Sequence, residues 1–235
     1  MKNLFPMRLS VFVYLFIRRS LDDKSYITLH DLVVSSGYKP DKNKNGINRK
    51  FVTILDTMEG LEYFIKEFGE YSGYKVCILQ LNSEKFDTAN SFAIVSLNEL
   101  QKMREYKSKL RNVSYDKLLL ILCYIRVNKL RRSEYQQNNA HKKKPEFFYR
   151  QIKTIADDTA LSPKTVSACI TALESLNIIV SRPMPRYKDK YDNWHTDVTL
   201  FVDKTGNWED ELKWGEEFLL NNKALHEDSV QTQLY

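Results

Sequence analysis

Apolar residues recur three or four positions apart along the second half of the chain, which is the spacing of one helix face. Helices are predicted on this basis over residues 114–130 and 147–160. A third helix is predicted to begin at Pro163 and to end at Asn177, with one buried stripe. That stripe consists of Val166, Cys169, Ile170, Leu173 and Leu176.

A sharp turn separates the second and third of these helices. Ser162 is a favourable N-cap, because its hydroxyl can accept from an otherwise unpaired backbone N–H. Pro163 takes the first helical position, where its missing N–H costs nothing. After the third helix, residues 178–182 and 195–202 are predicted to be β-strands, separated by a loop rich in proline and charge.

The predicted order of this half is helix, helix, turn, helix, strand, basic loop, strand. It resembles a winged helix-turn-helix domain, whose third helix enters the major groove of DNA and whose hairpin contacts the flanking backbone. Residues 152–179 resemble the helix-turn-helix of replisome-organiser and RepA-type replication initiators of low-GC Gram-positive phages and plasmids, and of many bacterial winged-helix regulators. The family pattern is matched at Ala156 and Val166. It is matched less well at Ala160, where glycine is usual and alanine must tolerate the turn at some cost.

The first half of the chain repeats this order more loosely. Helices are predicted over residues 9–18, 28–38 and 47–61, a hairpin over residues 62–81, a strand over residues 91–97 and a charged helix after it. Thr28 is the expected cap of the second helix, and Gly37 marks its end. We therefore predict a mainly helical α+β fold of tandem winged helix-turn-helix domains with small β-hairpin wings. The expected parts are a winged-helix-like domain at 1–97, a linker helix at 98–112, a DNA-binding domain at 113–206 and an acidic helix and tail at 207–235.

The charge distribution favours a polyanionic partner for the body of the chain. Lys and Arg number 36 against 30 Asp and Glu, which gives a formal charge of +6. The excess is largest over residues 111–206, whereas residues 207–235 are acidic. The alternative is a basic protein whose charge serves only solubility.

The third helix of the second half exposes small or hydrogen-bonding side chains and one cation, a face that can approach base edges. Its candidate DNA-binding residues are Lys164, Thr165, Ser167, Ala168 and Thr171. The predicted wing adds Arg182, Arg186, Lys188 and Lys190 as phosphate or minor-groove contacts. In each case solvation alone is the alternative.

Two further groups of residues are candidates for DNA contact. Lys142, Lys143 and Lys144 form either a phosphate clamp or a charged loop. In the first half, Asn48, Arg49, Lys50 and Thr53 occupy the face that corresponds to the third helix. This half is expected to be either a second DNA reader or a dimerisation domain.

The resemblance implies sequence-specific binding of double-stranded DNA and replication initiation on a plasmid, phage or other mobile element, with host replication proteins as partners. A dimeric transcription regulator that binds an operator needs the same surface, and a winged-helix protein-interaction module is the second alternative. In the acidic segment, Trp208, Leu212, Phe218 and Leu219 share one side of a helix. That side is expected to dock on its own domain or on the second subunit of a homodimer.

Motifs typical of nucleotide binding or metal binding are missing from the sequence. It has no phosphate-binding loop of the G-x-x-x-x-G-K-[ST] type, and its four histidines lie far apart. Asp157 and Asp158 are expected in the first two turns of a helix, where carboxylates favour the positive dipole end. We therefore predict no enzymatic activity, no cofactor and no metal.

The cysteine pattern and the N-terminal segment indicate a cytoplasmic protein without a membrane span. The three cysteines are odd in number and form no C-x-x-C pair, so we expect reduced thiols. The apolar run at residues 9–17 is too short to cross a membrane and is followed at once by Arg18 and Arg19. It is expected to be a buried first helix.

Overall fold

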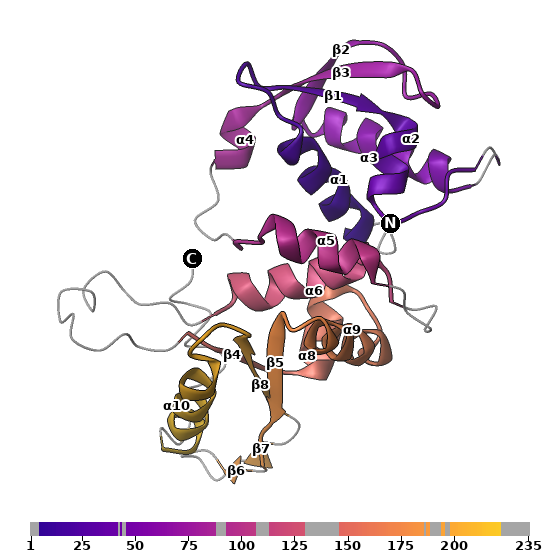
Figure 1. The fold of residues 1–235 in the computed structure, drawn as a ribbon. Helices are drawn as coiled ribbons and strands as arrows, with labels where there is room; N and C mark the ends of the chain where they lie inside the picture. Colours follow the sequence, from indigo (N-terminus) through magenta and orange to yellow (C-terminus); the bar gives the residue numbers. More distant parts are fainter. Residues whose placement is uncertain are drawn as a thin grey trace. The chain divides into compact units, whose positions relative to one another are not determined.

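The computed structural model describes residues 5–41, 43, 46–87, 93–106, 113–129, 146–185, 187–188, 194–195 and 198–221. It divides into two compact units (Figure 1). The first comprises Met1–Ala89 with Ser96–Leu120, and the second comprises Asn90–Val95 with Ile121–Tyr235. The division therefore falls inside helix α6 (Tyr115–Val127), and α5, at the position of the predicted linker helix, belongs to the first unit.

The first unit is built from helices packed on one face of a three-stranded sheet. Its elements are α1 (Phe5–Ile17), β1 (Lys24–Thr28), α2 (Leu29–Ser35), α3 (Ile47–Gly60), β2 (Phe64–Phe68), β3 (Val76–Leu81), α4 (Ser83–Asp87), α5 (Leu97–Glu105) and the first part of α6. The sheet is antiparallel, with β3 between β1 and β2. Leu15, Leu32 and Leu55 from the first three helices are fully buried against the inner face of the sheet. Burial of this continuous apolar surface is what holds the unit together.

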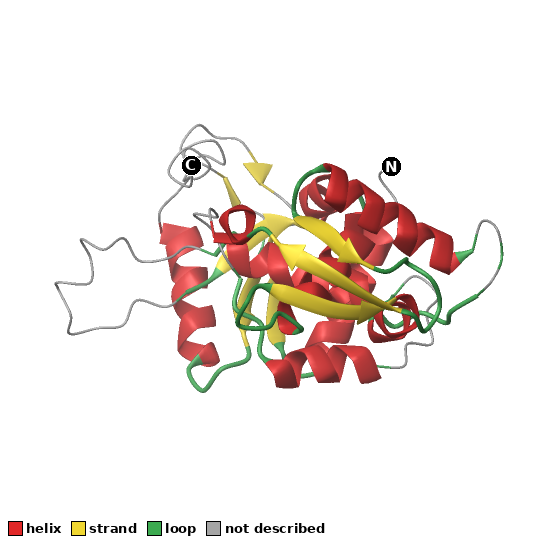
Figure 2. Cartoon of the chain, turned by 90° about the horizontal axis from the view of Figure 1, so that it is seen from above, coloured by secondary structure: helices red, strands yellow, loops and turns green. Residues whose placement is uncertain are grey.

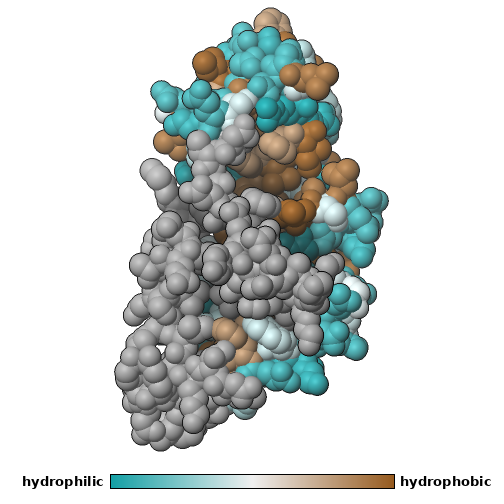
Figure 3. Space-filling model, turned by 90° about the vertical axis from the view of Figure 1, so that its left-hand side faces the viewer, coloured by the Kyte–Doolittle hydropathy of each residue, from teal (hydrophilic) through white to brown (hydrophobic). Residues whose placement is uncertain are grey.

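The outer face of this sheet is open to solvent. Alternate residues of a strand point to opposite faces, so Ile27 and Leu79 are buried while Tyr26, Ile65 and Val76 are 49–68% exposed. Figure 3 shows hydrophilic side chains over much of the described surface on the side in view, with hydrophobic side chains that in places lie next to one another.

The second unit has a sheet covered on both faces. Its elements are the rest of α6, β4 (Phe148–Gln151), α8 (Ile152–Thr159), α9 (Pro163–Ser175), β5 (Ile179–Pro183), β6 (Tyr187–Lys188), β7 (Trp194–His195), β8 (Val198–Asp203) and α10 (Trp208–Asn221). The main sheet is antiparallel, with β8 between β4 and β5 (Figure 1), and β6 pairs with β7. Figure 2 distinguishes the described helices, strands and loops of the chain by colour. Five successive residues of β8 are buried, because α10 covers the face opposite to α9.

The two units share one order of elements. With the β6–β7 pair set aside, each runs helix, strand, helix, helix, strand, strand, and in each three-stranded sheet the last strand lies between the other two. The chain is thus an α+β fold, as its pattern predicts, and its two main sheets are small, three-stranded and antiparallel rather than simple hairpins. The predicted N-cap of the second helix is confirmed, because the Thr28 hydroxyl accepts from the Asp31 N–H at 3.0 Å.

Three local predictions are wrong. Phe148–Gln151 was expected to be helical but forms β4, since its aromatic residues pair with β8 and Phe148 stacks on Phe201. Residues 93–96 form no strand; instead Ser96 and Glu99 make a capping box that starts α5. Asp157 and Asp158 lie in the last turn of α8, because the helix begins only at Ile152.

The acidic helix α10 docks on its own unit. Leu212 and Leu219 are buried in the core that Leu200 and Phe147 also form, with Trp208 and Phe218 packed at its edge. Of the two expectations for this helix, docking within the unit is the one observed. Among the described residues, no helix is long and apolar enough to cross a membrane.

Candidate nucleic-acid interface

Helix α9 begins at a tight turn whose conformation follows from its residues. Ala160 adopts a left-handed conformation, with φ 54° and ψ 31°, as the turn requires. The Leu161 N–H then donates to the Ala156 carbonyl at 3.0 Å and closes α8. The Ser162 hydroxyl accepts from the Thr165 N–H at 3.1 Å, which confirms Ser162 as the N-cap of α9.

One side of α9 is buried and the other is open. Val166, Cys169, Ile170 and Leu173 lie in the core, as the stripe predicts. Lys164, Ser167 and Thr171 are exposed and Ala168 is half-buried, so the face predicted to read DNA is accessible at these positions. The first turn of α9 contains no acidic residue. Its backbone N–H groups and the positive end of the helix dipole therefore favour an approaching anion.

Thr165 does not belong to this face. Only 8% of its surface is accessible, and its hydroxyl lies 2.9 Å from that of Ser162. The expectation that Thr165 is exposed is therefore wrong, because the third residue of the helix turns back toward its cap. Its role in the structure is to support the start of α9.

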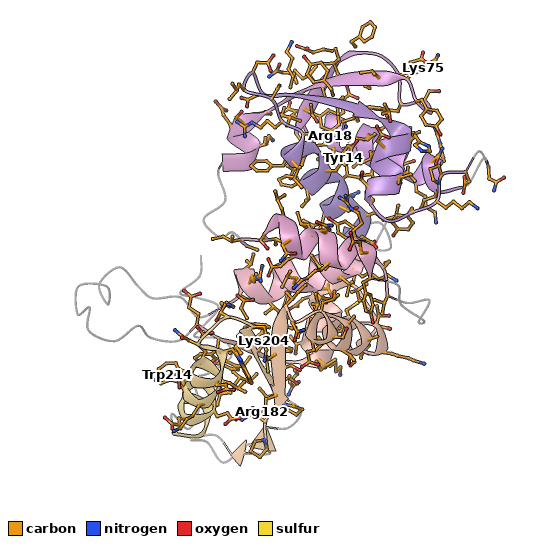
Figure 4. The ribbon with its side chains drawn as sticks, in the orientation of Figure 1. Tyr14, Arg18, Lys75, Arg182, Lys204 and Trp214 are labelled. Carbon is orange, nitrogen blue, oxygen red and sulfur yellow. The ribbon has the colours of Figure 1, made fainter. Side chains whose placement is uncertain are left out.

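The two polar side chains that end β5 point to opposite faces of the sheet. Ser181 lies on the α9 side, where its N–H and hydroxyl donate to Glu174 of α9 at 2.9 and 2.7 Å. Arg182, the next residue, forms an ion pair with Glu216 of α10 (Figure 4). Strand alternation thus separates Arg182 from Lys164, and the structure does not bring these two candidates together.

Most of the remaining basic candidates fall outside what the structure describes. Arg186, Lys190, Lys142, Lys143 and Lys144 lie outside the described residues. Lys188 is part of β6, and only its backbone is described. These residues remain predictions.

In the first unit, the start of α3 is already occupied by a carboxylate. The Asp41 carboxylate accepts from the Ile47 N–H at 3.0 Å, and the Asp41 backbone N–H donates to the Asn48 side-chain oxygen at 3.1 Å. Gly46 makes this possible, because a Cβ there would lie 1.7 Å from the Asp41 carboxylate. Asn48 is therefore engaged in the loop that precedes α3.

The rest of the α3 candidates are exposed. Arg49, Lys50 and Thr53 face solvent, and the Thr53 hydroxyl donates to the Arg49 carbonyl at 3.0 Å. Thr57 makes the same bond to Thr53 one turn later. These hydroxyls are used within the helix, which leaves the two cations as the groups best able to contact a phosphate.

Sequence reasoning missed a cluster of charges that ties α6 to the end of β8. The Arg126 guanidinium lies 3.0 Å from the Asp203 carboxylate, whose other oxygen pairs with the Lys129 ammonium. Arg126 and Lys129 are only 9% and 5% exposed. Burial raises the pKa of the nearby Glu211 carboxyl, while Lys129 opposes that shift. More than 70 residues separate the partners, so no local pattern could have indicated this cluster.

The described residues hold no group of three or more His, Cys, Asp or Glu side chains suited to a metal ion. Comparison of the chain with protein-family models, with curated proteins and with solved structures gives no match.

Proposed function

We propose that this chain is a tandem winged-helix protein that binds double-stranded DNA in a sequence-specific manner through α9. In this proposal α9 lies in the major groove. Ser167, Ala168 and Thr171 meet base edges, and Lys164 contacts guanine or a phosphate.

The accessible face of α9 is the observation that carries this proposal. The face offers small side chains and one cation, its helix start is free of acids, and its opposite side is anchored in the core. A rigid helix with short side chains can lie close to base edges, whereas a face of long charged side chains is more typical of a solvated helix.

Two further features support it. With β6 and β7 set aside, both units have the order helix, strand, helix, helix, strand, strand, which contains the three helices and two following strands expected of a winged helix and adds a strand after the first helix. The first unit also exposes Arg49 and Lys50 on α3, which suits a second, mainly phosphate-directed contact.

For the biological role, we propose replication initiation on a plasmid, phage or other mobile element. The support is the resemblance of residues 152–179 to initiators of that kind. An operator-binding regulator uses the same surface, so the arrangement of the bound sites distinguishes them. Directly repeated sites in an origin favour initiation, and a single inverted site at a promoter favours regulation.

Selection of bound duplexes from a random library is the first experiment. We expect one enriched motif and nanomolar-range binding to it. Lys164→Ala should then weaken binding to the selected duplex by about 1–3 kcal/mol and relax base preference at one position.

Lys213→Ala is the matched control, because Lys213 is exposed on α10 and lies away from α9. Its binding should equal that of the unmodified chain. An unenriched library, or equal losses for the two variants, would exclude α9 as the reader.

A further inference from the structure

The first unit contains a cavity that the proposed DNA interface does not use. Its volume is about 190 Å³, and it is lined from α1, α2, α5 and the start of α6. Polar and apolar groups contribute about equally to its wall, and Ser10 is joined there by the polar side chains of Tyr14, Arg18, Ser35, Arg104 and Tyr115. All of these belong to the first unit.

Tyr14 presents an unused hydrogen-bonding group to this cavity. Its side chain is only 7% exposed, and its hydroxyl has no hydrogen-bond partner among the described residues. The nearby Ser10 differs, because its hydroxyl donates to the Met7 carbonyl at 2.9 Å. A buried phenol without a partner is costly, so a ligand or a water molecule that accepts from it is favoured.

Two guanidinium groups flank the same cavity. The guanidinium carbon of Arg18 lies 4.8 Å from the centre of the Tyr14 ring (Figure 4). That of Arg104 lies 5.8 Å from the centre of the Tyr115 ring. Neither arginine forms an ion pair with a described carboxylate. The aromatic contacts position both cations and leave their N–H groups available to an anion.

The protonation of Tyr14 agrees with a donor role. Burial raises the pKa of Tyr14 to about 12, Asp31 adds to this shift, and Arg18 and Arg104 oppose it. The phenol therefore keeps its proton at neutral pH. Asp31 is one acid against two cations, so the surroundings of the cavity remain attractive to an anion.

We propose that this cavity binds the phosphate group of a small phosphomonoester. The groups that line it, two guanidiniums, a phenol and the Ser35 hydroxyl, can all donate hydrogen bonds to phosphate oxygens. The small volume admits a terminal phosphate, which has three free oxygens. An internal phosphodiester of nucleic acid is flanked on both sides by sugars and is a poorer fit. The site lies in the first unit, and binding there does not depend on the proposed action of α9.

Calorimetric titration of the full chain with inorganic phosphate and with glycerol phosphate, at constant ionic strength, tests this proposal. We expect saturable binding of one molecule per chain. Arg104→Gln and Tyr14→Phe should each weaken it by about tenfold or more, because each removes a hydrogen bond to a charged group.

Tyr14→Phe is informative because removal of an unpaired hydroxyl leaves the fold intact. Its thermal midpoint without phosphate should be unchanged or higher, and the increase caused by phosphate should shrink. Lys39→Gln is the control, since Lys39 is exposed on the same unit and does not line the cavity. It should bind phosphate like the unmodified chain.

Three results would overturn the proposal: no binding of either phosphate compound, an equal loss in Lys39→Gln, or unchanged affinity in both cavity variants. Dimethyl phosphate distinguishes the source of the group. If it binds as well as glycerol phosphate, and Arg104→Gln also weakens duplex binding, the cavity contacts a nucleic-acid backbone instead. If duplex binding stays unchanged in Arg104→Gln, the cavity is separate from the DNA interface whatever becomes of the α9 proposal.

Discussion

The two units have the same order of elements and the same sheet order, yet they place charge differently. In the second unit, α9 starts from the neutral cap Ser162, and an ion cluster around Asp203 is largely buried. In the first unit, the Asp41 carboxylate occupies the start of α3, and the described ion pairs, such as Lys24–Glu67 at 2.7 Å, are partly exposed. At the third helical position, α9 buries Thr165 where α3 exposes Arg49.

This difference shows how one architecture can support unequal surfaces. A helix start free of acids attracts an anion, whereas a start already bound by a carboxylate has its N–H groups and dipole partly satisfied. We therefore expect α9 to be the reader of sequence and α3 to contribute at most phosphate contacts. The buried ion cluster around Asp203 is a second difference between the units, because removal of one charged partner leaves the others buried without compensation.

The largest expected effect is on stability and concerns the buried cluster. Asp203→Asn should cost about 3–5 kcal/mol in the free energy of unfolding, because Arg126 and Lys129 then remain buried without their carboxylate. Urea unfolding measures this. Glu62→Gln, which breaks the exposed pair with Lys85 in the first unit, should cause no measurable change. Equal stability of the two variants would remove this contrast between the units.

A reciprocal exchange of charge tests the two helix starts directly. Ser162→Asp keeps a good N-cap but adds a negative charge at α9, so DNA affinity should fall about tenfold. Asp41→Asn keeps a capping oxygen at α3 and removes a charge, so affinity should rise by about twofold to threefold. Fluorescence anisotropy at one fixed salt concentration compares them. A stronger response to Asp41→Asn than to Ser162→Asp would make α3 the principal contact.

The smallest expected effect concerns Thr165 and tests whether this residue stabilises the start of α9 or contacts the DNA bases. Thr165→Val preserves shape but removes the hydroxyl that contacts Ser162, so unfolding free energy should fall by about 1 kcal/mol. Base preference, measured with the selected duplex and its single-base variants, should stay the same. A changed base preference would mean that Thr165 contacts the DNA despite its burial.

Local elements could be predicted wherever neighbouring residues decide them. Thr28 and Ser162 cap their helices as expected, and the apolar stripe of α9 is buried as its spacing indicates. Some errors come from a missed local signal, as at the Ser96–Glu99 capping box, and others lie where distant residues decide. Phe148–Gln151 becomes a strand because β8 pairs with it, and Arg182 faces α10 because Glu216 lies on that side of the sheet. The cavity at Tyr14 also collects residues from four helices, which no spacing in the sequence relates.

The sequence alone determined the α+β class, the position of α9 and the chemistry of its outer face, because helical periodicity and capping act over only a few residues. Only the tertiary structure decided which of those residues remain accessible and which charges meet. Arg182 pairs with Glu216 of α10, Phe148 pairs with Phe201 of β8, and Asp203 holds two cations more than 70 residues away. Such contacts depend on chain segments that fold together, and burial and pairing of charge follow from that geometry rather than from local composition.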